Sequence, residues 1–343
     1  MGRDLIFFAS VLACLVAMAT FETCTAVSSQ QFGGCKEVTP ETTVSGVLST
    51  NSTTGGDTHY ASTLKPRLDL TVTSPNDSDY TYVLALPGGE ALLSEQPLER
   101  RNLDKVVRLN KDGQVLPSVF ISRDTAAYDR ITGMLLDQDP AYTLLIQWYG
   151  LISRARISSL NNTISEWQVP SGGWPRLGAL LGDELYLVDY ISNYAYSFNL
   201  LSHTQTIRKT GITKPTSLAT ATLPSTSQRV FIILHGWDDQ ISIFDESWNL
   251  TATIGDRGSG DGQLDHPWQV LVTPWSTILV VDNNNHRVSE FSLSGTFVRH
   301  VLTSRDGLFY PFCISYNHPF LWVVHDARKN RKNIVRRYLL CPK

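Results

Sequence analysis

Four side chains that can bind a divalent cation recur at regular intervals in the second half of the chain. They are Asp189, His235, Asp282 and His325, separated by 46, 47 and 43 residues. Carboxylate oxygens and imidazole nitrogens are ligands of zinc and other divalent metals, so equivalent copies in a repeat could form one site. Each residue also ends an apolar run, where an aspartate can cap its own turn. The spacing leaves both roles open.

The apolar runs before these residues belong to a repeat of roughly 45 residues. The four runs are ELYLVD, RVFIILH, TILVVD and FLWVVH; two upstream runs, YTYVLAL and YTLLIQ, place Leu86 and Gln147 at the same position, with an insertion at about 87–101. A proline opens the preceding strand in five copies, at Pro66, Pro175, Pro215, Pro267 and Pro311, and Ile131 replaces it in the second copy. Proline at the first residue of a strand removes no ladder hydrogen bond. Six such units predict an all-β fold, a six-bladed β-propeller with four-stranded blades, over residues 46–340.

The copy around Asp282 resembles an NHL repeat. The resemblance rests on the segment GSGDGQL at 258–264, then Pro267 and Asp282, then Asn285-His286-Arg287-Val288, Phe291 and Gly295. It implies a six-bladed propeller of the NHL type. Such propellers occur in ubiquitin ligases, RNA-binding regulators, extracellular receptors and the lyase that completes peptide amidation, so the resemblance leaves the function open.

The resemblance to the amidating lyase can be tested on residue types. In that enzyme, metal-binding histidines directly follow the blade prolines; the corresponding residues here are Arg67, Arg176, Thr216, Trp268 and Phe312. None of these ligates zinc as histidine does. Ser259 lies in an inter-blade loop, and neither C-x-x-C nor H-E-x-x-H occurs. We therefore expect a binding module without metal or cofactor; the alternative is an extracellular hydrolase or amidating-lyase-like enzyme with its site at the central channel.

The N-terminus has the pattern of a secretory signal peptide. A short charged start precedes the apolar run from Leu5 to Ala19, which is shorter than the roughly 20 residues of a membrane span. We expect a signal peptide at 1–19, with cleavage as late as residue 26, and a leader at 20–45 that includes the start of the strand closing the ring. Four N-x-S/T acceptors agree with export: Asn51, Asn76, Asn161 and Asn249. These features predict a secreted glycoprotein without a membrane span.

The charges and aromatic residues restrict the classes of partner that we expect. The formal net charge of −3 gives no general attraction to nucleic acid. A basic hairpin contains Arg328, Lys329, Arg331 and Lys332, which either form a solvated loop or contact a sulfated glycan or an acidic protein surface. Five tryptophans fall near turns or strand ends, at 148, 237, 248, 268 and 275, where they either anchor a partner or fill the core. A protein or glycan partner fits these features best.

The ends of the chain are expected to meet at the seam of the ring. A segment at about 42–48 could supply the fourth strand of the last blade, antiparallel to a strand at 334–340. Cys35 and Cys341 would then lie close together, and the sequence predicts a disulfide between them. Cys313 would be a buried thiol or a partner of Cys24.

Overall fold

The computed structural model of the chain describes residues 64–75, 78–98, 104–121, 130–147, 150–169, 174–327 and 332–342. The regular structure in this part of the chain is β-strand apart from two short 3₁₀-helices, η2 (Pro87–Gly89) and η4 (Ser304–Asp306). The strands are β1 (Leu64–Thr73), β2 (Ser78–Ala85), β3 (Ala91–Pro97), β4 (Lys105–Leu109), β5 (Val115–Ile121), β6 (Ile131–Leu136), β7 (Tyr142–Gln147), β8 (Leu151–Arg156), β9 (Ser159–Gln168), β10 (Pro175–Leu181), β11 (Glu184–Asp189), β12 (Tyr194–Asn199), β13 (Gln205–Thr210), β14 (Pro215–Thr222), β15 (Arg229–His235), β16 (Gln240–Phe244), β17 (Leu250–Ile254), β18 (Pro267–Val272), β19 (Thr277–Asp282), β20 (Arg287–Ser292), β21 (Phe297–Leu302), β22 (Pro311–Asn317), β23 (Phe320–Ala327) and β24 (Lys332–Pro342).

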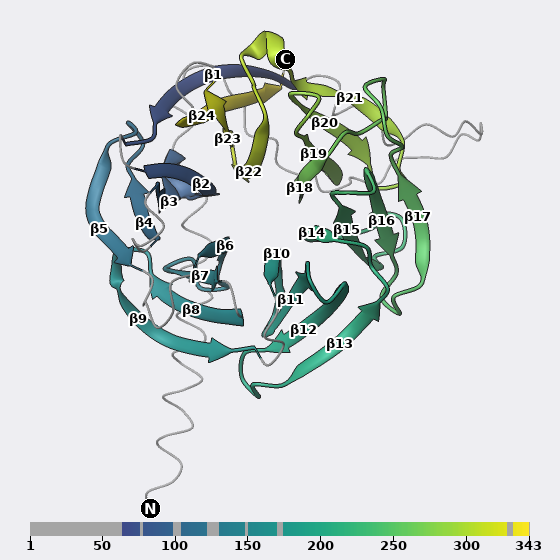
Figure 1. The fold of residues 1–343 in the computed structure, drawn as a ribbon, viewed down its shortest axis with the longest axis horizontal. Helices are drawn as coiled ribbons and strands as arrows, with labels where there is room; N and C mark the ends of the chain where they lie inside the picture. The colour runs from purple at the N-terminus through teal and green to yellow at the C-terminus, as the bar shows by residue number, and fades with distance from the viewer. Residues whose placement is uncertain are drawn as a thin grey trace, which may run out of the picture. The chain divides into compact units, whose positions relative to one another are not determined.

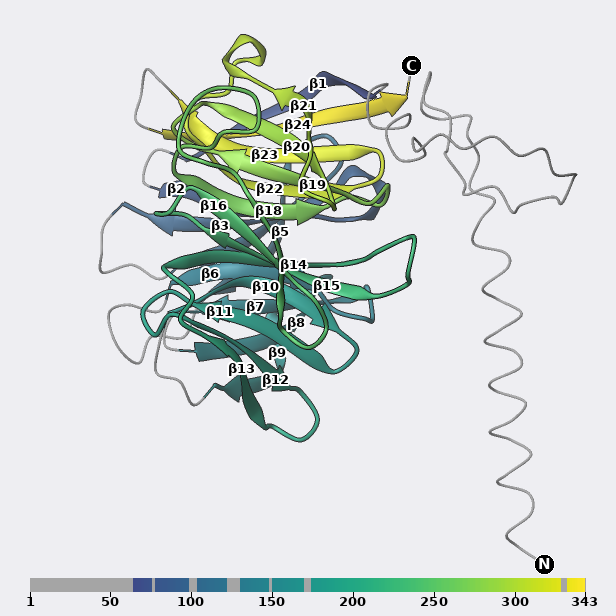
Figure 2. The ribbon, with the colours of Figure 1, turned by 90° about the vertical axis from the view of Figure 1, so that its right-hand side faces the viewer.

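The strands form six four-stranded sheets around one axis (Figure 1). Blades 1 to 5 are β2–β5, β6–β9, β10–β13, β14–β17 and β18–β21, each in sequence order from the centre to the rim. Blade 6 consists of β22, β23, β24 and β1. In the view of Figure 2 the strands run from one face of the ring to the other. The prediction of an all-β, six-bladed β-propeller with four-stranded blades is confirmed.

The core lies between the blades. The second strands are apolar on both faces because a neighbouring blade covers each face; all six residues of β19, for example, are buried. Clusters of buried apolar side chains join neighbouring sheets: Ile232 and Val270 belong to the cluster between blades 4 and 5, and Leu279 and Ile314 to the next one. Packing of sheet against sheet thus supplies most of the apolar burial.

The inner strands leave little space for side chains around the axis. Small or polar side chains form hydrogen bonds between inner strands of neighbouring blades. A Cβ atom at Gly178 would collide with the carbonyl oxygen of Tyr186, so the bulged inner strand β10 needs glycine there. Gln269 of β18 accepts from Ile314 N–H at 2.7 Å and donates to its carbonyl oxygen at 2.9 Å. Ser315 of β22 accepts from Ala85 N–H at 2.9 Å. The hydrogen bond between Ser315 and Ala85 connects blade 6 to blade 1.

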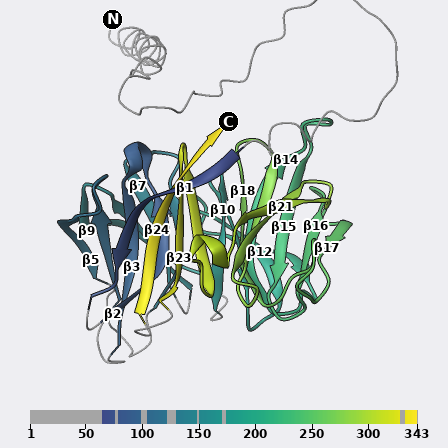
Figure 3. The same ribbon diagram turned by 90° about the horizontal axis from the view of Figure 1, so that it is seen from above.

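Strand β1 closes the ring. It lies beside β24 at the rim, the N-terminal colour next to the C-terminal one (Figures 1 and 3). Ser74 Oγ donates to the Asn333 carbonyl oxygen at 2.7 Å, across 259 positions of sequence. The buried Arg337 on β24 forms an ion pair with Asp69 on β1 at 2.6 Å and donates to the Gly89 carbonyl oxygen in blade 1. These contacts fix the last blade against both the closing strand and the first blade.

The position of the closing strand differs from the prediction. The fourth strand of blade 6 is β1, not a segment at 42–48, and Cys35 precedes β1 by about 30 residues rather than by a few. The contacts of Ser74 and Asp69 with β24 place the start of β1 near Cys341. Cys24 and Cys35 lie outside the described residues, and the structure does not describe the Cys341 side chain, so the disulfide stays a prediction. Cys313 is a buried free thiol, and burial raises its pKa to about 12.

The first blade was assigned one strand out of phase. The run YTYVLAL was expected to be a second strand, but it is the inner strand β2. The error arose because Pro66 fits the proline pattern of an inner strand, yet it lies in β1, and Tyr80 takes the proline position in blade 1. The second strand β3, inside the expected insertion, pairs Glu95 with Tyr80 just before the bulge seen in every inner strand. Glu95, not Leu86, therefore occupies the repeat position, and Arg67 does not belong to an inner strand.

Several predicted features fall outside the described residues: the signal peptide at 1–19, the leader at 20–45, and the acceptors Asn51 and Asn76. Among the residues that are described, no helix has the length and apolar character needed to cross a membrane.

The seam can be tested by removing the charge of Arg337. We expect Arg337→Met to lower the free energy of unfolding by about 3 kcal/mol, the lower end of the range for a broken buried ion pair, because Asp69 keeps some contact with water. A matched control is Arg108→Met, which breaks the more exposed pair with Glu90 inside blade 1; it should cost about 0.2–1 kcal/mol. Urea denaturation measures both, and equal losses would contradict the role given to Arg337.

Candidate functional site

Six polar side chains occupy the predicted repeat position, one in each blade. They are Glu95, Gln147, Asp189, His235, Asp282 and His325, and all six are buried. In blades 2 to 6 the residue pairs with the first residue of the inner strand, as Asp282 pairs with Pro267. In blade 1 Glu95 pairs with Tyr80, the third residue of β2. Since paired strands run antiparallel, the turns after the second strands and the loops before the inner strands share one face of the ring. We call it the turn face; it carries residues 190–193, 236–239, 283–286 and the loops ending at 174, 214, 266 and 310.

The two aspartates hold the backbone of this face. Asp189 Oδ1 accepts from the N–H groups of Ile191 and Ser192 at 2.9 and 2.7 Å, which caps its own turn. Asp282 accepts from Asp265 N–H at 2.8 Å and from Arg287 Nε at 2.7 Å. Burial raises the pKa of Asp282, and these hydrogen bonds oppose the shift. Both carboxylates therefore stabilise turns and loops of their own blades through hydrogen bonds.

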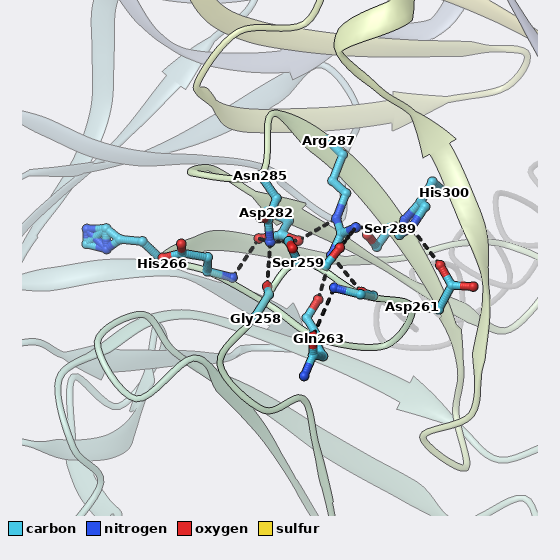
Figure 4. Close-up of polar contacts among 12 residues, drawn as sticks. Gly258, Ser259, Asp261, Gln263, His266, Asp282, Asn285, Arg287, Ser289 and His300 are labelled. Carbon is cyan, nitrogen blue, oxygen red and sulfur yellow. Dashed lines mark hydrogen bonds and ion pairs between the residues drawn. The ribbon is translucent and has the colours of Figure 1, made fainter.

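Arg287 organises the loop before blade 5 (Figure 4). Besides Asp282, its guanidinium donates to the carbonyl oxygens of Ser259, Gly260 and Gln263 at 2.8–3.0 Å. Asn285 Nδ2 donates to the Gly258 carbonyl oxygen at 2.8 Å. The Asn and Arg of the NHL-like motif thus fix the segment GSGDGQ as a closed loop, and Ser259 contributes its backbone there.

A second contact repeats in three consecutive blades and was not predicted from the sequence. The fourth residue of each turn has a positive φ and accepts a hydrogen bond from the N–H of the residue before the next blade's proline. The pairs are Asn193 with Lys214 at 2.9 Å, Asp239 with His266 at 2.6 Å, and His286 with Tyr310 at 3.1 Å. The signal was present: the three turns have equal length, and Asn, Asp and His are the residue types most tolerant of this backbone conformation. The His of the motif therefore positions the loop into blade 6.

The two histidines at the repeat position are held as neutral groups. His235 Nε2 lies 2.9 Å from Ser242 Oγ, and its Nδ1 lies 3.1 Å from the Thr213 carbonyl oxygen. His325 Nδ1 donates to the Asp326 carbonyl oxygen at 2.8 Å, while its buried Nε2 has no hydrogen-bond partner among the described residues. Burial lowers the pKa of both side chains, that of His325 to about 4.

The structure distinguishes exposed tryptophans, which could anchor a partner, from those that pack against the core. Trp248 stacks on Phe231 at 4.2 Å, and Trp275 donates to Glu290 at 2.9 Å; both are half-buried and pack against core clusters. Trp237 and Trp268 are 63% and 40% exposed. Trp148 lies outside the described residues.

Trp237 and Trp268 form a continuous aromatic surface with His266 on the turn face. The His266 ring lies between them, 5.1 Å from Trp237 and 5.6 Å from Trp268, edge to face with both. Tyr310, 39% exposed, stands on the loop into the next blade and packs on His286 at 4.3 Å. Large aromatic side chains exposed in contact with one another are typical of binding surfaces.

Positive charge lies beside this surface, at blade 3. Arg176 and Lys214 both lie over the ring of Tyr190, which stacks on Trp174 at 6.4 Å. Arg176 also approaches Tyr82 of the inner strand β2: burial raises the pKa of Tyr82, and the charge of Arg176 opposes the shift. Of the residues that follow the blade prolines, Arg176 thus contributes a guanidinium to this face and Trp268 an exposed indole, whereas the hydroxyl oxygen of Thr216 is buried.

Of the four predicted basic-hairpin residues, the structure describes only Lys332. Arg328, Lys329 and Arg331 lie outside the described residues, and Lys332 Nζ donates to the Pro75 carbonyl oxygen at the seam, at 2.9 Å. Within the described ranges, no three His, Cys, Asp or Glu side chains are grouped closely enough to hold a metal ion. A binding role for Asp189, His235, Asp282 and His325 stays a prediction.

Comparison with known proteins supports the fold and leaves the family open. No protein-family model matches the chain. A stretch of 46 residues is 41% identical to Protein lin-41 of Caenorhabditis elegans, which is 13% of this chain and 4% of that protein. The chain therefore corresponds to a small fraction of that relative's length.

Among solved structures, a structural genomics protein of unknown function from Bacteroides thetaiotaomicron superposes with a TM-score of 0.61 at 15% identity, over 78% of this chain and 73% of that one. A catalytically inactive virginiamycin B lyase from Staphylococcus aureus with quinupristin gives a TM-score of 0.54 at 13% identity, over 80% of this chain and 89% of the lyase. At these identities the likeness shows the fold alone. The chain is a six-bladed β-propeller.

The buried histidine of blade 6 predicts a pH dependence of stability. The unfolded chain binds a proton on this side chain near pH 6.5, and the folded chain only near pH 4. Since the unfolded state binds more protons between these values, His325 destabilises the fold as the pH falls from about 6.5 to 4. We expect His325→Gln, which introduces the residue of the same position in blade 2, to reduce the loss of unfolding free energy between pH 7 and 4.5 by roughly 2–3 kcal/mol.

Urea denaturation at the two pH values measures this difference. The exposed His203 provides the matched control, His203→Gln, which should lose as much stability as the unchanged protein. If His325→Gln loses as much stability as that control between the two pH values, His325 does not carry the proposed linkage. His235, whose pKa burial also lowers, and the carboxylates account for the loss that remains in the variant.

Proposed function

We propose that the chain is a secreted, N-glycosylated propeller of the NHL type that binds a protein or glycan through its turn face and performs no chemistry. The observation that carries this proposal is the aromatic surface formed by Trp237, His266 and Trp268. Burying these side chains would remove a large apolar area from water, and tryptophan is enriched among the residues that dominate binding energy.

Some side chains of this face hold its loops and others are exposed on it, and this arrangement supports a binding role. Asp282, Asn285, His286 and Arg287 are occupied in holding turns and inter-blade loops. The loops they hold carry aromatic residues of this face: half-buried His266 lies on the loop before Pro267, and Tyr310, 39% exposed, on the loop before Pro311. A rigid scaffold that presents variable side chains on fixed loops is a common arrangement for binding surfaces.

The NHL-type assignment is supported by the roles of its motif residues. The Asp, Asn, His and Arg at 282, 285, 286 and 287 each hold a defined turn or loop. Asp189 in blade 3 occupies the position of Asp282, and Asn193 in blade 3 and Asp239 in blade 4 replace His286 with different residue types. The weaker sequence pattern of those blades is therefore compatible with the same loop architecture.

Binding through the turn face can be tested with single substitutions. The purified protein is used to capture partners from the extracellular medium, and the identified partner's affinity is then measured by calorimetry. Trp237→Ala and Trp268→Ala should each weaken binding by at least about 2 kcal/mol, roughly 30-fold. The matched control is Leu201→Ala, which removes a 74% exposed side chain from the turn between β12 and β13, at the opposite face. Unchanged affinity in both tryptophan variants would place the binding surface elsewhere.

Export and glycosylation can be tested together in a secreting cell. We expect the protein in the medium, with an apparent mass that falls on treatment with an N-glycanase. Asn249 is exposed in the turn before β17, where a glycan is sterically accessible, so Asn249→Gln should remove one glycan. Thr251→Ser keeps the acceptor triplet and should keep the glycan. Retention of the protein inside the cell, or an unchanged mass after the enzyme, would contradict the proposal.

A further inference from the structure

Two positive charges lie over one aromatic ring at the turn face of blade 3. The guanidinium carbon of Arg176 is 5.3 Å and Lys214 Nζ is 5.0 Å from the centroid of Tyr190, so no more than about 10 Å separates them. Both side chains are half-buried. Among the described residues neither forms an ion pair with a carboxylate. Like charges at this separation repel each other, most strongly where water is partly excluded, and an anion bound between them would relieve the repulsion.

Unsatisfied hydrogen-bonding groups occur at the same place. Arg176 Nε and Thr216 Oγ1 are buried and have no hydrogen-bond partner in the described part of the chain. They occupy the same position of neighbouring inner strands, directly after Pro175 and Pro215. Buried polar atoms without a partner are uncommon in folded proteins, and here the unused groups include a cationic donor. A ligand group with negative charge would supply an acceptor for the Arg176 guanidinium, which also has a side-chain hydrogen bond with Tyr82.

The carboxylates of the adjoining turns do not fill this role. Asp189 Oδ1 is engaged by the N–H groups of its own turn, while its buried Oδ2 has no hydrogen-bond partner among the described residues. Asp239 Oδ1 accepts from His266 N–H at 2.6 Å. Asp238 is exposed beside Trp237, so the positive part of the surface ends at blade 4. Beyond it, at blade 5, the position of Arg176 and Thr216 is taken by Trp268.

We infer that the turn face binds an acidic glycan, whose carboxylate or sulfate group lies between Arg176 and Lys214 while a neighbouring sugar ring packs on Trp268. The order of groups around the axis matches such a ligand: a cationic pair for the acid and, two blades further on, an aromatic face for the apolar C–H side of a sugar ring. An acidic protein segment would also satisfy the charges, and the polyglutamate probe below tests that outcome. This inference rests on the proposed function and names the chemistry of its ligand.

The test uses three probes on the secreted full-length protein: a hyaluronan octasaccharide, which carries carboxylates only, a heparin octasaccharide, which carries sulfates as well, and a polyglutamate peptide. Calorimetry at about 50 and 150 mM salt measures affinity, and tryptophan fluorescence reports contact with Trp268. We expect at least one saccharide to bind more tightly than the peptide, and more weakly at the higher salt. The tighter saccharide identifies the acid group that the site takes.

Substitutions then locate the site. Arg176→Gln and Lys214→Gln should each weaken saccharide binding at least tenfold, as should Trp268→Ala. Lys214→Arg keeps the charge and should stay within about threefold of the unchanged protein, which guards against a loss caused by misfolding. The matched control is Lys209→Gln: Lys209 also lies over an aromatic ring, that of Phe244 at 5.4 Å, but on the outer strand β13.

Four results would overturn the inference. They are the absence of saccharide binding, binding that Arg176→Gln and Lys214→Gln leave unchanged, a polyglutamate affinity equal to that of the saccharides, and loss of binding only when Arg328, Lys329, Arg331 and Lys332 are all changed to Ala. The last would assign the glycan to the basic hairpin. If Trp237→Ala abolishes capture of an identified partner while Arg176→Gln does not, the turn face keeps its binding role and only the acidic glycan is refuted.

Discussion

The whole structure depends on one seam, where the last blade takes its outer strand from the other end of the chain. Every second strand is apolar on both faces, and such a strand is stable only if a blade covers each side. That condition holds for all six blades only when the ring is closed. Arg337, with Asp69 on β1 on one side and the Gly89 carbonyl oxygen on the other, ties the closing strand and the first blade to the last one. Ser315 and Ala85 repeat the connection at the inner strands.

The sequence predicted the later blades well because several independent markers agree there. A proline at the start of the inner strand, a doubly buried second strand and a polar residue at its end recur at constant spacing, and the pairing of Pro267 with Asp282 confirms that they belong together. In blade 1 these markers conflict. Pro66 lies in a strand of blade 6, Tyr80 replaces the proline, and the second strand ends in the polar segment Ser94–Pro97. Periodicity reports local burial, and it cannot show which end of the chain a strand will pair with.

The candidate site was harder to predict, for a physical reason. The residue types most typical of a reactive or binding site are those of Asp282, Asn285 and Arg287. Their side chains form hydrogen bonds with carbonyl and N–H groups of loops distant in sequence, as the 2.8 Å contact between Arg287 and Gln263 shows. The groups that lack partners are less conspicuous. In the sequence, Arg176 and Thr216 indicate only that histidine is absent from the positions after the blade prolines. That their side chains contain unsatisfied buried atoms follows only from the assembled blades. Sequence motifs identify the scaffold, whereas the surface available to a ligand follows from what the scaffold leaves unpaired.

The contact between Ser74 and Asn333 joins residues 259 positions apart, and this separation orders events during biosynthesis. A ribosome releases the N-terminal end first, so β1 emerges long before β24 exists. Until then its backbone groups form an unpaired strand edge, which is the kind of surface through which nascent chains associate wrongly. Blades 1 to 5 contain only strands that are consecutive in sequence and can assemble in turn, while the loop-closure entropy of the seam must be overcome last. Within the part of the chain that the structure describes, the earliest strand to be synthesised therefore finds its partner only when the latest has been made.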